Sequence, residues 1–225
     1  MGGKENAARE ALRFVKDGQT IGLGTGSTAA IFIKLLADKV KAENLSVKCI
    51  PTSLASKALA YQLGLALLEP EEVAGIGLAV DGADLVDAKL NLIKGGGGAQ
   101  TREKVIDYFA DKFIVIADSS KLSKKLKGQV PLEILKFAYP FVEKALKKEF
   151  GVKIEIRRKP NGDAWISDNS NFIADACFKA ISSPTKLESQ LNEIAGIVEN
   201  GIFSRNVSTV IVGYDKKVLV LGKQK

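Results

Sequence analysis

The chain has 225 residues, 46% of them hydrophobic and none of them histidine, so it can bury a sizeable core and is neither disordered nor a histidine-bound metalloprotein. Its formal net charge is +7, but the excess lies in residues 119–160, which hold 12 Lys and Arg residues against 4 Asp and Glu residues. Because this basic segment lacks interleaved aromatic residues, we favour a solvated face over a nucleic-acid footprint and expect no nucleic-acid partner.

The N-terminal segment lacks the apolar stretch of a signal peptide, and no later run is long enough to span a bilayer. We therefore expect a cytoplasmic protein with no membrane partner. Cys49 and Cys177 lie in apolar runs without CxxC spacing, which predicts small core residues in a reducing compartment.

The first half of the chain alternates segments typical of helices and of strands. Helices are expected at 4–16, about 31–40 and 53–63, and strands at 19–23, 47–50, 76–80, 90–93 and 113–117. Apolar strands that alternate with helices predict a parallel sheet covered on both faces.

The second half differs in character, beginning with a predicted linker at 128–131. Strands are expected at 132–137, 152–158, near 165, at 172–177 and at 202–203, and helices at 140–150 and 184–194. The last strands, 209–212 and 218–221, resemble those of the first half. The sequence therefore predicts an α/β fold, a Rossmann-like doubly wound, mostly parallel sheet with an inserted smaller α+β domain. The catalytic domain is expected at 1–129 and 205–225, and the smaller domain, with a role in oligomerisation, at 130–204.

A glycine-rich segment, Gly22 to Ala29, follows the first predicted strand and opens a helix. Its glycines allow the backbone to approach an anion. The N–H groups at the helix start, with the hydroxyls of Thr25, Ser27 and Thr28, can then bind phosphate oxygens. The alternative is a strand–helix turn that needs glycine only for packing.

The same segment satisfies the dinucleotide pattern Gly24-x-Gly26-x-x-Ala29, which is weak by itself. That interpretation requires an acidic residue at the end of the next strand, which instead ends Ile50-Pro51-Thr52-Ser53. No Walker lysine follows either. A small phosphorylated ligand is therefore favoured over NAD or ATP, and no nucleotide cofactor is expected.

Two carboxylates, Asp81 and Asp84, follow an apolar strand at the sheet edge where doubly wound folds bind ligands. One could move protons during sugar ring opening while the other holds hydroxyls. Asp87 continues the spacing, so a Mg²⁺ site is an alternative, and an Asp-Gly turn with a capping aspartate is another.

A second glycine loop, Gly95 to Gly98, begins after Lys94 and is followed by Glu103 in the first turn of a predicted helix. The helix dipole favours the ionised form of Glu103, as suits a base, although ordinary charge complementation at a helix start explains it equally well. Lys121 follows a further predicted strand and is expected at the same edge of the sheet. The alternative is that it is an ordinary surface lysine.

Together these residues resemble the A-type ribose-5-phosphate isomerases over essentially the whole chain. The resemblance is carried by Gly24-Thr25-Gly26-Ser27-Thr28, Asp81-Gly82-Ala83-Asp84, Lys94-Gly95-Gly96-Gly97, Thr101-Arg102-Glu103-Lys104, Asp118-x-x-Lys121 and the ending at 201–203 and 210–213. One departure is Leu85, where the family commonly has Glu.

The resemblance implies a metal-free, cofactor-free interconversion of ribose 5-phosphate and ribulose 5-phosphate through an enediolate, in a homodimer or homotetramer of the pentose phosphate pathway. Glu103 would be the base between C2 and C1, Asp81 would assist ring opening, and Asp84 would bind or polarise hydroxyls. Lys94 would stabilise the charge on the enediolate oxygens. The implied substrate-binding residues are Thr25, Gly26, Ser27, Thr28, Asp81, Gly82, Ala83, Asp84, Lys94, Gly95, Gly96, Gly97 and Lys121, with Lys4 as a further phosphate contact.

The main alternative is a non-catalytic sugar-phosphate sensor like the effector domains of some bacterial repressors. Too few residues precede Gly24 for an attached helix-turn-helix domain, and a sensor does not need Glu103. A deaminase or an acyl-transfer enzyme on a related sheet is less favoured, because the first would be expected to use histidine.

Overall fold

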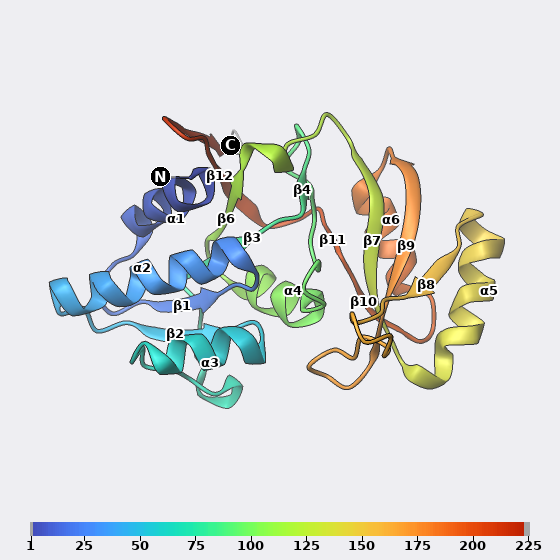
Figure 1. Cartoon of the computed structure of the whole chain (residues 1–225), viewed down its shortest axis with the longest axis horizontal. Helices are drawn as coiled ribbons and strands as arrows, with labels where there is room; N and C mark the ends of the chain where they lie inside the picture. Colours follow the sequence, from blue (N-terminus) through green and yellow to red (C-terminus); the bar gives the residue numbers. More distant parts are fainter. Residues whose placement is uncertain (1, 223–225) are drawn as a thin grey trace. The chain divides into compact units, whose positions relative to one another are not determined.

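The computed structural model describes residues 2–222 and divides them into two compact units (Figure 1). The first unit comprises the chain up to Ala83, Arg102–Leu122 and the residues from Asn206 on. The second comprises Asp84–Thr101 and Ser123–Arg205. Within residues 2–222, no helix combines the length and apolar character that a membrane crossing requires.

The first unit is built on one sheet of order β13-β12-β6-β3-β1-β2. Its strands are β1 (Thr20–Leu23), β2 (Lys48–Pro51), β3 (Leu78–Gly82), β6 (Phe113–Asp118), β12 (Val207–Gly213) and β13 (Val218–Gly222). Its helices are α1 (Gly3–Ala11), α2 (Ser27–Glu43), α3 (Leu54–Gln62) and most of α4 (Gln100–Phe109), with 3₁₀ turns η1 (Leu12–Phe14), η2 (Pro70–Glu72) and η3 (Ser119–Lys121). All neighbouring strands run parallel except β12 and β13. The expected Rossmann-like, mostly parallel sheet is confirmed.

Successive residues of β1 face opposite sides of this sheet, and helices cover both sides. Ile21 and Leu23 are fully buried in a core that includes Phe32 of α2. Gly22 lies on the opposite face, where an added Cβ would come within 2.6 Å of Ile106 in α4. A strand whose two faces are both covered is apolar along its whole length, as this one is.

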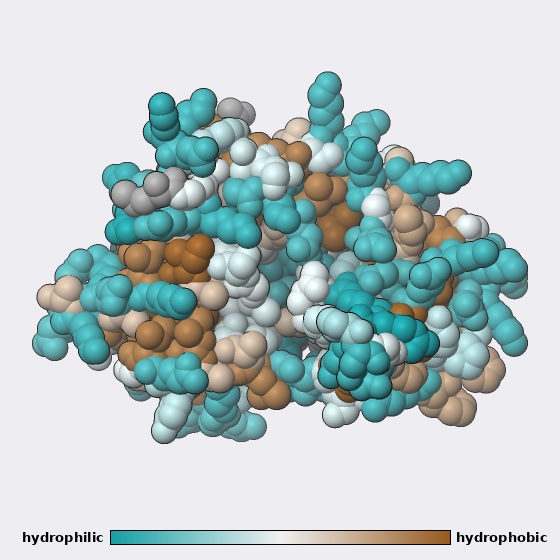
Figure 2. All heavy atoms as spheres, viewed as in Figure 1, coloured by the Kyte–Doolittle hydropathy of each residue, from teal (hydrophilic) through white to brown (hydrophobic). Residues whose placement is uncertain are grey.

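Figure 2 shows hydrophobic surface over α2 and α3 of the first unit. Ile31 and Leu35 of α2 and Leu59 of α3 belong to the rim of the core and are only partly buried. Hydrophilic residues flank this surface, as expected for amphipathic helices on a buried sheet.

The second unit contains a four-stranded antiparallel sheet, of order β10-β7-β9-β8, and a three-stranded sheet, of order β11-β5-β4. Its strands are β4 (Leu85–Val86), β5 (Leu92–Ile93), β7 (Leu126–Ile134), β8 (Ile154–Ile156), β9 (Phe172–Ile181), β10 (Ile197–Asn200) and β11 (Ile202–Phe203). Its helices are α5 (Tyr139–Phe150) and α6 (Pro184–Asn192), with the 3₁₀ turn η4 (Lys136–Ala138). The expected smaller α+β domain is confirmed as a fold.

Strand β7 has one apolar face and one polar face. Val130, Leu132 and Ile134 join the core that α5 and α6 cover, whereas Glu133 is buried outside that cluster. The predicted linker at 128–131 is wrong, because β7 continues through it and pairs with β9 over that length.

The extent of the second unit differs from the expected 130–204. Residues 84–101 and 123–129 belong to it as well. The reason for the first of these segments is strand pairing: β4 pairs with β5, and β5 pairs with β11, so that Leu92 lies opposite Phe203. Asp84 and Lys94 are therefore carried by the second unit.

The two cysteines, both free thiols, have different surroundings. Cys49 is buried in the core of the first unit, and burial raises the pKa of its thiol to about 12. Cys177 is exposed, contrary to expectation, because β9 directs its neighbours Ala176 and Phe178 into the core and Cys177 to the other face.

The start of α1 lies directly against β12, backbone to backbone. A Cβ added to Gly213 would lie 1.8 Å from the carbonyl oxygen of Gly3 and 2.9 Å from the amide nitrogen of Ala7. Neither neighbour is the end of a flexible side chain, so the contact requires glycine.

Replacing Gly213 by Ala should destabilise the protein by about 1–3 kcal/mol or more, because the backbone of α1 has to move away. Denaturant unfolding measures this change. Gly75→Ala is the control, since no heavy atom lies within 4 Å of the position of its added Cβ. Equal stability of the two variants would contradict the close contact.

Candidate active site

The turn between β1 and α2 leads into a helix N-terminus in the first unit. Gly26 precedes α2 with φ 98°, a conformation that favours glycine, and has no side chain to bond to the helix-start N–H groups. Ser27 is exposed and Thr28 is buried at the first two helical positions. These N–H groups and the helix dipole favour a bound phosphate.

The Thr25 hydroxyl is engaged within the protein. It donates to Oγ of Ser53 at 2.8 Å and lies 2.8 Å from Oγ1 of Thr52. Ser53 Oγ donates to Ser56 Oγ at 3.1 Å, and Ser56 Oγ donates to the Gly24 carbonyl at 2.7 Å. This chain of hydroxyls fixes the turn, so the part of Thr25 is to hold the loop in shape.

Sequence analysis missed Thr52, Ser53 and Ser56 as parts of this site. The signal was the run of hydroxyl residues directly after β2, at the position where a dinucleotide fold would have a carboxylate. Because β1 and β2 run parallel and adjacent, their carboxyl ends meet at one edge of the sheet.

Asp81, at the end of β3, is fully buried and held by backbone donors. Its Oδ1 accepts hydrogen bonds from the N–H groups of Thr25 at 2.9 Å and Gly82 at 2.6 Å. A Cβ on Gly24 would lie 2.0 Å from this Oδ1. At Gly24 a glycine is therefore needed for packing, because a side chain there would collide with the Asp81 carboxylate.

Two lysines lie near Asp118 at the same edge of the first unit. Lys4 Nζ donates to Oγ of Ser27 at 2.9 Å. Burial acts to raise the pKa of Asp118, but the hydrogen bonds from Ser120 and the charges of Lys121 and Lys4 outweigh it and lower that pKa. The two lysines thus add positive charge beside Asp118, and Lys4 also brings it to Ser27 in the first turn of α2.

Glu103 lies in the first turn of α4, as the sequence predicts. Only 3% of the residue is exposed, so its carboxyl group is shielded from bulk water. The positive end of the helix dipole favours its ionised form. A shielded carboxylate at this position is suited to proton abstraction.

In the second unit, Asp84 is bound to the glycine loop. The Gly96 N–H donates to Asp84 Oδ2 at 2.7 Å, and the Asp84 N–H donates to the carbonyl of Ile93 at 2.8 Å. A Cβ on Gly96 would lie 2.7 Å from Asp84 Oδ1. As at Gly24, the missing side chain admits a carboxylate.

Lys94 follows β5 and is 2% exposed. Its N–H donates to the Gly201 carbonyl at 2.8 Å, and its Nζ lies 5.3 Å from the centre of the Phe203 ring, within cation–π range. A Cβ on Gly201 would lie 2.3 Å from the Lys94 carbonyl oxygen, so this approach also requires glycine.

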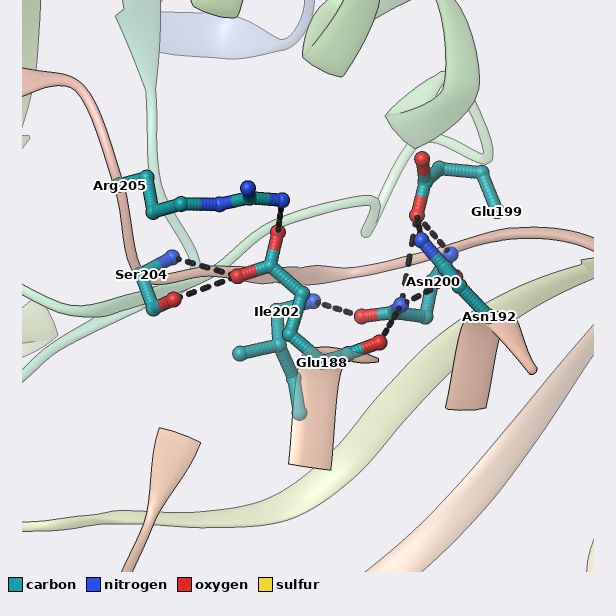
Figure 3. Close-up of polar contacts among 7 residues, drawn as sticks. All are labelled: Glu188, Asn192, Glu199, Asn200, Ile202, Ser204 and Arg205. Atoms are coloured by element: carbon teal, nitrogen blue, oxygen red, sulfur yellow. Dashed lines mark hydrogen bonds and ion pairs between the residues drawn. The ribbon is translucent and has the colours of Figure 1, made fainter. Parts of the chain in front are cut away.

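A polar network holds β11, the strand that supports Lys94 (Figure 3). Asn200 Oδ1 accepts from the Ile202 N–H at 3.0 Å, and Asn200 Nδ2 donates to the Glu188 carbonyl at 3.1 Å. The buried Glu188 carboxylate accepts from the hydroxyl and the N–H of Ser204 and lies 3.9 Å from Arg205 Nη2. The network joins α6 to both ends of β11.

Asp87, considered above as a Mg²⁺ ligand, closes a turn. Its Oδ1 accepts from the N–H groups of Lys89 at 2.8 Å and Asn91 at 2.9 Å, and its Oδ2 accepts from Asn91 Nδ2 at 2.8 Å. Over residues 2–222 no three His, Cys, Asp or Glu side chains are grouped so as to hold a metal ion.

The sequence was compared with known families and proteins. The family model described as ribose 5-phosphate isomerase A (phosphoriboisomerase A) matches residues 48–217. The ribose-5-phosphate isomerase A of Methanococcus aeolicus is 46% identical, over 97% of this chain and 94% of that relative. The chain belongs to the ribose 5-phosphate isomerase A family.

Solved structures of this family have the same fold. The isomerase of Methanocaldococcus jannaschii superposes with a TM-score of 0.93 at 45% identity, covering 98% of each chain. A D-ribose-5-phosphate isomerase in complex with phospho-erythronic acid gives 0.94 at 45% identity, covering 98% of this chain and 97% of that one. The resemblance drawn from the motifs is confirmed, and the chain is an aldose–ketose isomerase rather than a sensor.

The predicted site residues of this isomerase fall into two groups, one in each unit. The first unit carries Thr25, Gly26, Ser27, Thr28, Asp81, Gly82, Ala83, Glu103 and Lys121, and the second carries Asp84, Lys94, Gly95, Gly96 and Gly97. The chain passes between the units after Ala83, after Thr101 inside α4, after Leu122 and after Arg205. The first two of these passages lie within a few residues of a predicted catalytic carboxylate.

Replacing the buried Asn200 by Ala should lower the free energy of unfolding by about 1–3 kcal/mol, because the Ile202 N–H loses its acceptor. The turnover number should fall as well, because β11 supports Lys94. Urea unfolding and a steady-state assay measure the two effects. Asn192→Ala is the control, since the hydrogen bonds of this exposed side chain, from the Asn200 amide and to Glu199, join it to β10 and not to β11. An Asn200→Ala enzyme with unchanged stability and turnover number would contradict the role of Asn200 in supporting β11.

Proposed function

We propose that this isomerase interconverts ribose 5-phosphate and ribulose 5-phosphate through an enediolate, as a cytoplasmic enzyme of the pentose phosphate pathway. The observation that carries the proposal is Glu103, a carboxylate shielded at a helix N-terminus, in a chain that matches ribose-5-phosphate isomerases over nearly its full length. The two groups of site residues would act on one substrate.

The phosphate would be bound by the start of α2, with the hydroxyls of Ser27 and Thr28 and the charges of Lys4 and Lys121. The position of Lys4 on Ser27 supports this, since it adds a cation to the helix N-terminus. The complex of a related isomerase with phospho-erythronic acid, a compound with a phosphate and a carboxylate, also supports it.

The chemistry would begin with opening of the sugar ring, assisted by Asp81. Glu103 would then remove the proton from C2, and the electron pair would form the C1–C2 double bond of the enediolate. A proton passes from the C2 hydroxyl to the C1 oxygen, and Glu103 returns its proton to C1 as the C2 carbonyl forms. The carboxyl group of Glu103 is therefore ionised again at the end of the reaction.

Lys94 and Asp84 would hold the oxygens of the reacting carbons. A lysine that is 2% exposed interacts strongly with a developing negative charge, because little water screens it. Lys94 would therefore supply the electrophilic assistance that a metal ion gives in other isomerases. Asp84 would accept hydrogen bonds from sugar hydroxyls.

We also propose that the chain forms a homodimer or homotetramer through the second unit. Phe137 and Phe141 are 85% and 60% exposed, and their ring centres lie 5.8 Å apart. Two adjacent exposed rings are typical of a surface that a partner subunit covers.

Replacing Ser27 and Thr28 together by Ala should chiefly raise KM for ribose 5-phosphate, because these residues would hold the phosphate. Unphosphorylated ribose should be a very poor substrate for the unaltered enzyme. Steady-state kinetics measure both, with Ser46→Ala, an exposed serine, as the control. Equal activity on ribose and on its phosphate would remove the case for a phosphate site.

Glu103→Gln should lower the rate of isomerisation by about 10²–10⁴-fold, the usual contribution of a general base. The amide keeps the size of the side chain but cannot accept the proton. In heavy water the unaltered enzyme should incorporate deuterium at C1 or C2, and the variant should bind substrate but show almost no exchange. Glu43→Gln, at the exposed end of α2, is the matched control. A Glu103→Gln enzyme with the normal rate would place the base elsewhere.

A further inference from the structure

One arginine of the second unit contacts the backbone of the glycine loop. Arg157 Nη1 donates to the carbonyl oxygens of Gly95 and Gly96, each at 2.9 Å. Its Nε donates to Asp175 Oδ2 at 2.8 Å, and its Nη2 pairs with Asp175 Oδ1 at 2.5 Å. The guanidinium thus joins the loop to β9.

This arrangement is held from several sides. The side chains of Arg157 and Asp175 are 16% and 13% exposed, and the guanidinium carbon lies 5.7 Å from the centre of the Trp165 ring. A guanidinium donates in a fixed plane, so the two-point pairing with Asp175 also sets the direction of Nη1 toward the loop. An ion pair this deep needs such additional hydrogen bonds to offset its desolvation.

The contact holds two successive peptide groups, and the first of them also binds Asp84. The Gly95 carbonyl and the Gly96 N–H belong to the same planar unit and point in opposite directions. Arg157 holds the oxygen, while the N–H donates to Asp84 Oδ2 at 2.7 Å. Neither glycine has a side chain that would restrict rotation of this group. Its orientation therefore depends on Arg157, on Asp84 and on the Gly98 N–H, which donates to the same Gly95 carbonyl at 2.9 Å.

We infer that Arg157 is a positioning residue, which fixes the Gly95–Gly96 peptide and through it the Asp84 carboxylate. It acts through the loop and Asp84, and its kinetic consequence rests on the proposed function of Asp84. Without Arg157 only the Gly98 N–H holds the Gly95 carbonyl, so the peptide is less restrained and the hydrogen bond from Gly96 to Asp84 is weakened. A misplacement of about 1 Å in a catalytic site can cost about 10²-fold in rate.

The first test is Arg157→Lys, which keeps a positive charge beside Asp175. One ammonium nitrogen cannot serve a two-oxygen carboxylate and two carbonyls in the same plane. The unfolding midpoint should stay close to that of the unaltered protein, while kcat/KM for ribose 5-phosphate falls by about 10–100-fold. Hydrogen exchange of the Gly96 amide, followed by NMR, should accelerate.

The matched control is Arg158→Lys. Arg158 is the next residue, and its Nη1 donates to the carbonyl of Gly162 at 2.9 Å, within its own turn. This variant should change neither kcat/KM nor the exchange of Gly96. A second variant, Arg157→Met with Asp175→Asn, removes the ion pair without leaving an isolated buried carboxylate and should show the same kinetic loss.

Normal kcat/KM and normal Gly96 exchange in Arg157→Lys would overturn the inference. So would an acceleration of exchange in the β7 and β9 amides as large as that at Gly96, because the role would then be general stability. If the unaltered protein does not isomerise ribose 5-phosphate, the proposed function fails, while the Gly96 exchange still decides whether Arg157 fixes the loop.

Discussion

Hydrogen bonds from the backbone to carboxylates, one buried and one exposed, determine how both groups of predicted site residues are built. Asp81 accepts from two backbone N–H groups, and Asp84 accepts from Gly96. At Gly24 and Gly96 the carboxylate lies where a Cβ would otherwise stand. These two glycines, one in each loop, therefore have the same physical function, which is to admit an acidic side chain to the backbone.

The two units supply different kinds of support for these carboxylates. In the first, parallel strands end at one edge, and hydroxyls after β2 hold the Thr25 turn. In the second, side chains on the polar face of an antiparallel sheet contact the loop. The carboxylate of Glu133 on this sheet is also held by hydrogen bonds, which it accepts from Thr101 Oγ1 at 2.6 Å and Ser167 Oγ at 2.9 Å. Residues 123–205 thus support the glycine loop, although none of the predicted site residues lies within them.

Local patterns predicted the sheet of the first unit and the position of Glu103, because strand alternation and helix-start signals depend on near neighbours. They could not predict that Arg157 is partly buried against Asp175 and the loop. In the sequence it belongs to an ordinary basic cluster, and 62 residues separate it from Gly95. The linker expected at Gly128 failed for a related reason, since pairing with β9 outweighed the local preference of glycine and proline for turns. Contacts between distant segments decide such cases.

The backbone contact between Gly3 and Gly213 has a practical consequence for handling the protein. It fixes α1 from its first residue, and the next residue, Lys4, donates to Ser27 at the start of α2. An affinity tag joined to the N-terminus would begin within a few residues of the contact between Lys4 and Ser27, and an acidic tag would compete with Ser27 for the Lys4 ammonium group. Such a tag should be removed before kinetic work, so that the measured Michaelis constant reflects the enzyme and not the tag.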